Sequence, residues 1–149
     1  MTPVLVQPQR GSALIVSLIF LVILTLLGIT AASVTSQEER MAGNTRDRDL
    51  AFEAAEAAMR DAELRLPNAT FRGLATTLNV TDANDAAYWN AYNWGTSISP
   101  SQTLNQIVQQ PQIVLQRRGA TNYYRITTRG FGGTANAVVI LQAEYLYTP

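Results

Sequence analysis

The sequence predicts an α+β fold in which one long N-terminal helix packs on a small antiparallel β-sheet of three or more strands. Three observations predict it: an uncharged, apolar stretch over residues 11–37, a proline-free, alanine-rich stretch over residues 38–66, and short β-rich runs after residue 111. The first half of the helix has the composition of a membrane span, and the second half has one apolar side that another element must cover.

Composition excludes several classes of function. Charged residues make up 15% of the 149 residues, below the roughly 25% of an ordinary soluble domain. The chain has no cysteine and no histidine, so it offers no disulfide, no thiol nucleophile and no imidazole for zinc or for general base catalysis. The net charge of zero argues against a nucleic-acid partner. With no catalytic constellation in view, the sequence predicts neither an enzyme nor a cofactor.

The apolar stretch over residues 12–36 predicts a transmembrane helix. About 20 apolar residues cross a bilayer as a helix, and this run is too long for the core of a secretory signal peptide. Arg10 on its N-terminal side places that end in the cytoplasm by the positive-inside rule. A plain membrane anchor remains an open interpretation of this stretch.

Residues 37–66 predict an amphipathic continuation of the same helix. Alanine dominates this stretch, Pro67 is where the helix should stop, and Gly43 with Asn44 is its weakest point. Apolar residues recur at spacings of three and four and form one packing stripe: Phe52, Ala55, Met59, Ala62 and Leu66.

Residues 67–149 predict a small head whose sheet covers that stripe. Residues 67–110 are irregular, and we favour core packing over a binding surface for four aromatic residues there: Tyr88, Trp89, Tyr92 and Trp94. Strands are expected over residues 113–115, 123–128 and 137–147, with a glycine-rich hairpin loop over residues 129–135. Together they form an antiparallel meander.

One loop offers a candidate calcium site. Asp82, Asn84 and Asp85 are oxygen ligands of the kind calcium prefers. An EF-hand loop would continue with Asp or Asn and then Gly, whereas positions 86 and 87 are both alanine. We therefore favour an ordinary Asx turn and predict no metal.

Three stretches resemble the PilX-type minor pilins of the type IV pilus, within the type IV pilin-like superfamily. They are residues 9–14 (QRGSAL), residues 37–58 (QEERMAGNTRDRDLAFEAAEAA), and the sheet segments 124–127 (YRIT) and 135–139 (ANAVV). The resemblance implies a type IV pilin-like fold in four parts. These are a prepilin leader peptide (1–11), a transmembrane and fibre-core half of the helix (12–36), an amphipathic half (37–66), and a periplasmic or extracellular head (67–149).

The resemblance also implies processing of the N-terminus. Prepilin peptidase would cut between Gly11 and Ser12, and Ser12 would be N-methylated. Major pilins carry a glutamate at the fifth mature position, which pairs with the N-terminus of the subunit ahead in the fibre. Here that position is Val16. A subunit with nothing ahead of it has no use for the glutamate, so Val16 is consistent with a place at the pilus tip, as in the similar pseudopilin K.

The function implied is that of a minor pilin in type IV pilus biogenesis, within a priming complex at the tip that serves cell adhesion and twitching motility. Implied partners are other minor pilins, pilus assembly proteins, prepilin peptidase, inner membrane lipid and a tip adhesin. The implied location is the bacterial inner membrane, with a single pass and a cytoplasmic N-terminus, and then the pilus tip, periplasm or cell surface. Two alternatives remain: a pseudopilin K-like subunit of a type II secretion system, and a bitopic membrane-anchored binding protein.

Overall fold

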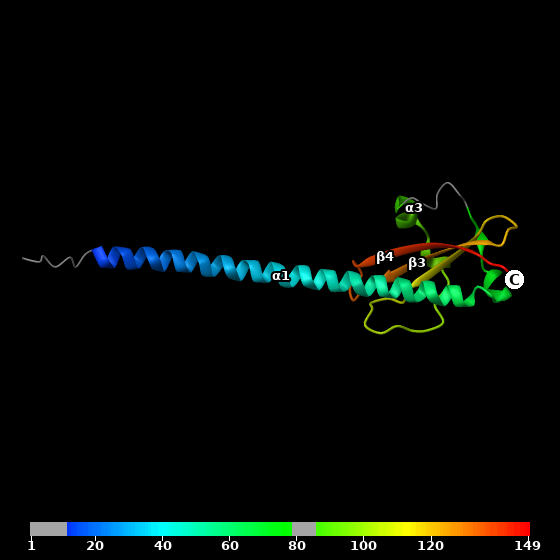
Figure 1. Cartoon of the computed structure of the whole chain (residues 1–149), viewed down its shortest axis with the longest axis horizontal. Coiled ribbons are helices and arrows are strands. Elements are labelled where there is room, and N and C mark those ends of the chain that lie inside the picture. The colour runs from blue at the N-terminus through cyan, green and yellow to red at the C-terminus, as the bar shows by residue number, and fades with distance from the viewer. Residues whose placement is uncertain (1–11, 79–85) are drawn as a thin grey trace, which may run out of the picture. The chain divides into compact units, whose positions relative to one another are not determined.

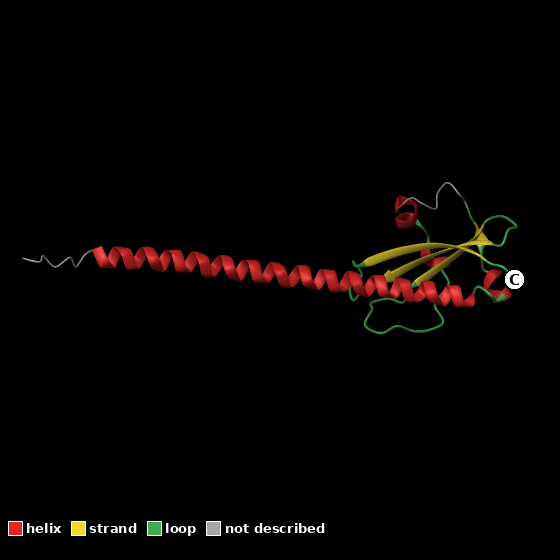
Figure 2. Cartoon of the chain, viewed as in Figure 1, coloured by secondary structure: helices red, strands yellow, loops and turns green. Residues whose placement is uncertain are grey.

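The computed structural model describes residues 12–78 and 86–149, and it divides the chain into two compact units (Figure 1). The first is Met1–Gly43 and the second is Asn44–Pro149. In the part of the first unit that the structure describes, the chain is helical throughout. The second unit contains a mixed sheet, short helices and loops (Figure 2).

The helix α1 (Ser12–Arg65) begins in the first unit and continues into the second without a break at Gly43 or Asn44. It ends one residue before the expected Leu66, because Pro67 cannot continue a helix. Asn68 then caps the four-residue helix α2 (Ala69–Arg72), and its side-chain oxygen accepts from the backbone nitrogen of Thr70 at 2.8 Å.

The sheet contains four strands in the order β1-β2-β3-β4, with bounds Thr76–Thr77, Gln112–Arg117, Tyr123–Phe131 and Val138–Leu146. β2, β3 and β4 form the expected antiparallel meander. The short β1 was not predicted, and it makes the sheet mixed, because it pairs with β2 in parallel. Two residues are too short to show any periodicity in the sequence.

The hairpin between β3 and β4 also differs from the prediction. Arg129, Gly130 and Phe131 belong to β3 rather than to the loop, because they pair with residues 138–140 of β4. Gly130 is therefore a strand residue of the sheet and not part of a turn.

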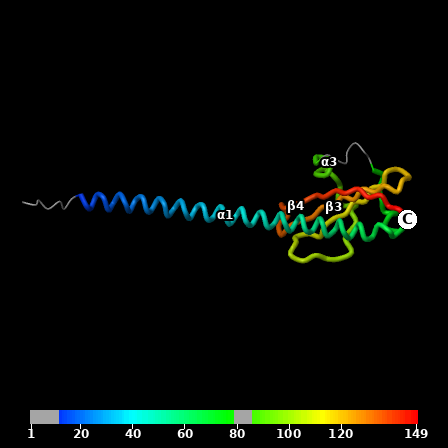
Figure 3. The backbone as a smooth tube through the Cα atoms, in the orientation of Figure 1, coloured from blue at the N-terminus to red at the C-terminus, as the bar shows by residue number. Residues whose placement is uncertain are grey.

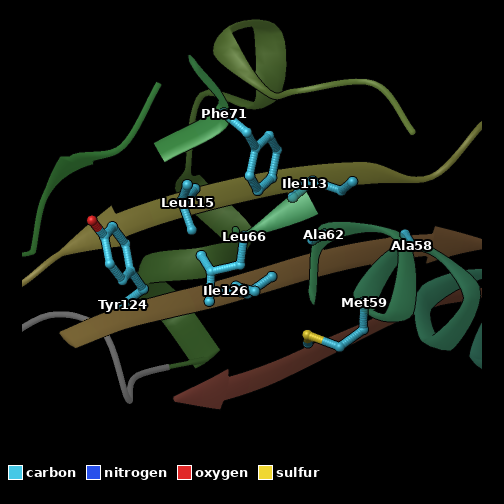
Figure 4. Close-up of a cluster of buried hydrophobic side chains, with 9 residues drawn as sticks. All are labelled: Ala58, Met59, Ala62, Leu66, Phe71, Ile113, Leu115, Tyr124 and Ile126. Atoms are coloured by element: carbon cyan, nitrogen blue, oxygen red, sulfur yellow. The ribbon is translucent and has the colours of Figure 1, made fainter. Parts of the chain in front are cut away.

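One face of the sheet packs against the second half of α1, and Figure 4 shows the side chains of this core. The buried cluster joins the helix, the turn after it and the two central strands. Its members are Ala58, Met59, Ala62, Leu66, Phe71, Ile113, Leu115, Tyr124 and Ile126.

The other face of the sheet carries an aromatic cluster. Helix α3 (Ala86–Ala91) and the 3₁₀ turn η1 (Trp94–Thr96) supply Trp89 and Trp94, which pack on Val114 of β2. The two tryptophan rings lie 5.7 Å apart between centroids, and Trp94 Nε1 donates to the carbonyl of Trp89 at 3.1 Å. The expected core packing of these aromatic residues is confirmed.

Candidate functional site

The first half of α1 presents apolar side chains with nothing from the described part of the chain covering them. Its most apolar 18-residue window has a mean hydropathy of 2.8 and no buried residue. Leu14, Leu24 and Ile29 are each exposed by more than 60%. By length and composition this helix can cross a membrane, and its apolar side chains match either lipid or the helices of other subunits.

Four hydroxyl side chains in this half bond to carbonyl groups of the same helix. Ser17 donates to the carbonyl of Leu14 at 2.9 Å, and Thr25 donates to that of Leu21 at 2.7 Å. Thr30 and Thr35 make the same bond four residues back, at 2.9 and 3.1 Å. Because each hydroxyl proton is used, these residues carry little cost in an apolar medium.

The predicted processing residues lie at the start of this helix. Ser12 is the first residue of α1, and Val16 is 49% exposed in its second turn. Gly11 lies outside the described residues. At position 16 the helix therefore carries an apolar valine side chain, whereas major pilins carry a glutamate at the corresponding position.

The second half of α1 approaches the sheet very closely through small residues. A Cβ atom on Gly130 would lie 2.1 Å from the carbonyl oxygen of Ala51 and 2.4 Å from the backbone nitrogen of Ala55. A Cβ atom on Gly132 would lie 2.3 Å from the carbonyl oxygen of Asp47. Only glycine in the strand and alanine in the helix allow this approach, which fixes how α1 sits on β3.

Two polar contacts hold the helix at this position. Thr128 Oγ1, which is buried, donates to the carbonyl oxygen of Ala55 at 2.9 Å. Asp47 accepts from the backbone nitrogen of Thr134 at 3.1 Å and from its hydroxyl. The hydroxyl bond, together with backbone N–H groups of the turn, lowers the pKa of Asp47 below its ordinary value.

A third contact holds the loop before β2 against α1. Asp61 accepts from the backbone nitrogen of Ser101 at 3.1 Å and from its hydroxyl, while Arg65 Nη1 donates both to Asp61 and to the carbonyl of Ser99. Burial alone would raise the pKa of Asp61. The hydrogen bonds from Ser101 and Arg65 stabilise the carboxylate more than burial destabilises it, so the net pKa is below the ordinary value.

On the face of the sheet that carries the aromatic cluster, Arg125 of β3 and Glu144 of β4 form an ion pair that links the two strands. Arg125 donates to Glu144 through Nε at 2.9 Å and Nη2 at 2.5 Å, and the Tyr123 hydroxyl donates to the same carboxylate at 3.0 Å. The arginine lowers the pKa of Glu144, and the carboxylate raises the pKa of Tyr123.

The predicted packing stripe needs one correction. Ala55, Met59, Ala62 and Leu66 are buried, but Phe52 is 46% exposed and lies outside the buried face. The buried face of the helix runs through Ala51 instead, whose carbonyl oxygen faces Gly130, so the neighbouring Phe52 lies to one side of the closest contact. Small residues take the buried positions at this end of the contact: Ala51, Ala54, Ala55 and Ala58.

No metal centre is found in the described part of the chain, where no three acidic, histidine or cysteine side chains gather. The candidate calcium residues Asp82, Asn84 and Asp85 lie outside the described residues.

The sequence does not predict how closely the second half of α1 packs against β3. The sequence places Gly130 in the hairpin loop, whereas it belongs to β3, and it predicts neither the bond from Thr128 nor the Asp47–Thr134 contact. The available signal was a run of small residues on both partners, with alanine repeating at helical spacing in one and glycine repeating at strand spacing in the other.

The helix is also the part of the chain that comparison with known proteins recognises. Residues 10–60 match the PilX N-terminal family. The PilX match covers both halves of α1 as far as Arg60 and ends before the sheet. No curated protein and no solved structure matches the chain.

The PilX match supports a PilX-type minor pilin of the type IV pilus. The exposed apolar helix followed by a small sheet fits this family, whose members are structural components rather than catalysts and work together with other pilus components. The same helix fits a membrane-anchored pilin.

Proposed function

We propose that this protein acts in a priming complex at the tip of the type IV pilus, together with other minor pilins, after prepilin peptidase has cut between Gly11 and Ser12. The observation that carries this proposal is the fully exposed apolar first half of α1, within the segment that matches PilX. A surface of this kind needs lipid before assembly and protein partners after it.

The proposed mechanism is a transfer of the helix between two apolar environments. The first half of α1 is held in the inner membrane with its N-terminus in the cytoplasm, and is then extracted and packed against other pilin helices. The hydroxyls of Ser17, Thr25 and Thr30 already bond to the helix backbone, so these three keep their partners in the transfer. The head, held to the helix by its own core, remains outside the membrane.

The tip position rests on Val16. A carboxylate in an apolar fibre core is costly unless a cation pairs with it, and a subunit with nothing ahead of it would have no such cation. A valine avoids that cost and remains compatible with lipid.

The test compares Val16→Glu with Val16→Leu in a strain that lacks the native gene and carries an epitope-tagged copy. Immunogold labelling of wild-type pili should mark the tips. We expect Val16→Glu to reduce the number of pili about tenfold or more, because the unpaired carboxylate opposes incorporation. Val16→Leu should leave the number unchanged. Label along the shaft, normal piliation with Val16→Glu, or a deletion that stops type II secretion and leaves pili intact would contradict the proposal.

A further inference from the structure

A surface pocket is lined by residues from the chain after α1, from the end of β2 and the turn after it, and from the C-terminal residues. Figure 3 shows the backbone of these segments at one end of the second unit. Its volume of about 370 Å³ falls in the range of small-molecule pockets. Two of its lining residues are arginines and none has an acidic side chain: Ala69, Arg72, Gly73, Arg117, Asn122, Tyr124, Tyr147 and Pro149.

The backbone and an aromatic ring hold Arg72 in place. Its Nη1 donates to the carbonyl oxygens of Leu66 at 2.8 Å and Pro67 at 2.6 Å. Its guanidinium lies 4.2 Å from the centroid of the Tyr147 ring. These contacts fix the side chain, and none of them is an ion pair.

Arg117, the last residue of β2, is held in the same way by carbonyl oxygens and an aromatic ring. Its Nε donates to the carbonyl oxygen of Thr121 at 2.6 Å and its Nη2 to that of Ala120 at 3.3 Å. Its guanidinium lies 5.6 Å from the centroid of the Tyr124 ring.

Neither guanidinium belongs to an ion pair within the described residues. The arginines that do form ion pairs there are Arg60, Arg65 and Arg125. Two fixed guanidiniums that form no ion pair within the described residues therefore line one pocket, and the planar guanidinium matches the geometry of carboxylate and phosphate groups.

We propose that this pocket binds a small oxyanionic ligand, whose carboxylate or phosphate group lies between Arg72 and Arg117. Preorganisation supports the proposal, since both side chains are already held by carbonyls and rings and lose little freedom on binding. The proposal is independent of the role in pilus assembly.

The experiment titrates the full-length protein, purified in a non-ionic detergent at low salt, with citrate, inorganic phosphate or glucose, using isothermal titration calorimetry. Arg117→Gln removes one of the two charges. Ala69→Glu places a carboxylate in the pocket without removing any side-chain contact, since Ala69 is exposed in the first turn of α2. Arg46→Gln is the matched control, because it removes one exposed arginine from α1 within the same unit, Asn44–Pro149.

We expect saturable binding of citrate or phosphate and no binding of glucose, and the tighter anion assigns a carboxylate or a phosphate ligand. Arg117→Gln and Ala69→Glu should each weaken binding about tenfold or more, which is the size of one or two charge-assisted hydrogen bonds. Arg46→Gln should leave the affinity unchanged. Absence of saturable anion binding, or equal weakening by Arg46→Gln, would overturn the proposal, since the second result indicates general charge attraction.

Discussion

Gly130→Ala adds a single methyl group, but it should destabilise the folded unit Asn44–Pro149 by more than so small a change suggests. The added Cβ atom would lie 2.1 Å from the carbonyl oxygen of Ala51, 2.4 Å from the nitrogen of Ala55 and 2.9 Å from the Ala55 Cβ atom. Two of these three neighbours are backbone atoms and cannot rotate away. The helix must therefore move from the strand by about 1.4 Å to open the shortest of these distances, 2.1 Å, to an ordinary contact distance of about 3.5 Å.

Two costs add up in this variant. Overpacking of a tight contact costs about 1–3 kcal/mol. The same displacement stretches the buried bond from Thr128 Oγ1 to the carbonyl of Ala55, now 2.9 Å, which contributes about 1 kcal/mol. The sum is about 2–4 kcal/mol, which for a head of this size (Asn44–Pro149) lowers Tm by about 10 °C or more.

Tryptophan fluorescence is the appropriate assay, because Trp89 and Trp94 both lie in the head, whereas far-ultraviolet circular dichroism also reports the exposed half of α1. Gly43→Ala is the matched control. It makes the same substitution in α1 where a Cβ atom meets nothing within 4 Å, and it should leave Tm unchanged or slightly higher. A Gly130→Ala protein whose Tm lies within about 2 °C of the wild type would refute the close helix–strand contact.

Two further predictions concern the same contact. Asp47 has a pKa below its ordinary value of 3.8, so its bonds to Thr134 stabilise the fold above that pH, and this stabilisation is lost as the pH falls through the lowered pKa. The difference in urea midpoint between wild type and Asp47→Asn should be full at pH 7 and shrink as the pH falls below 3.8 through the lowered pKa, and a difference that grows on acidification would contradict this sign. Met59→Ala should cost about 2–4 kcal/mol, because Met59 is buried. Phe52→Ala should change the unfolding free energy by about 0.5 kcal/mol or less, because Phe52 is half exposed. Equal losses from these two variants would show that Phe52 belongs to the core.

The sequence predicted the parts of the fold that depend on regular patterns. An uncharged stretch and an alanine-rich stretch gave one helix, and its observed end at Arg65 follows from Pro67. The runs of β-branched and aromatic residues gave β2, β3 and β4. Each of these patterns extends over several consecutive residues, so the local sequence was sufficient to predict the helix and these three strands.

The parts that were missed depend on contacts between distant segments. Glycine at position 130 is typical of a turn, but Gly130 pairs with Val139 of β4, and the passage of Ala51 and Ala55 across it explains why this strand position is a glycine. Phe52 continues the apolar spacing of the stripe, yet the buried face runs through the neighbouring Ala51. Arg72 and Arg117 lie 45 positions apart in the chain, so their common pocket had no local signal.

The central claim, that α1 is the N-terminal helix of a processed pilin subunit, is tested most directly by the mass of the mature N-terminus. The protein would be purified from membranes of a strain that has prepilin peptidase, digested, and analysed by mass spectrometry. The account predicts an N-terminal peptide that begins at Ser12 and carries one additional methyl group. An N-terminal peptide that still begins at Met1 would contradict it.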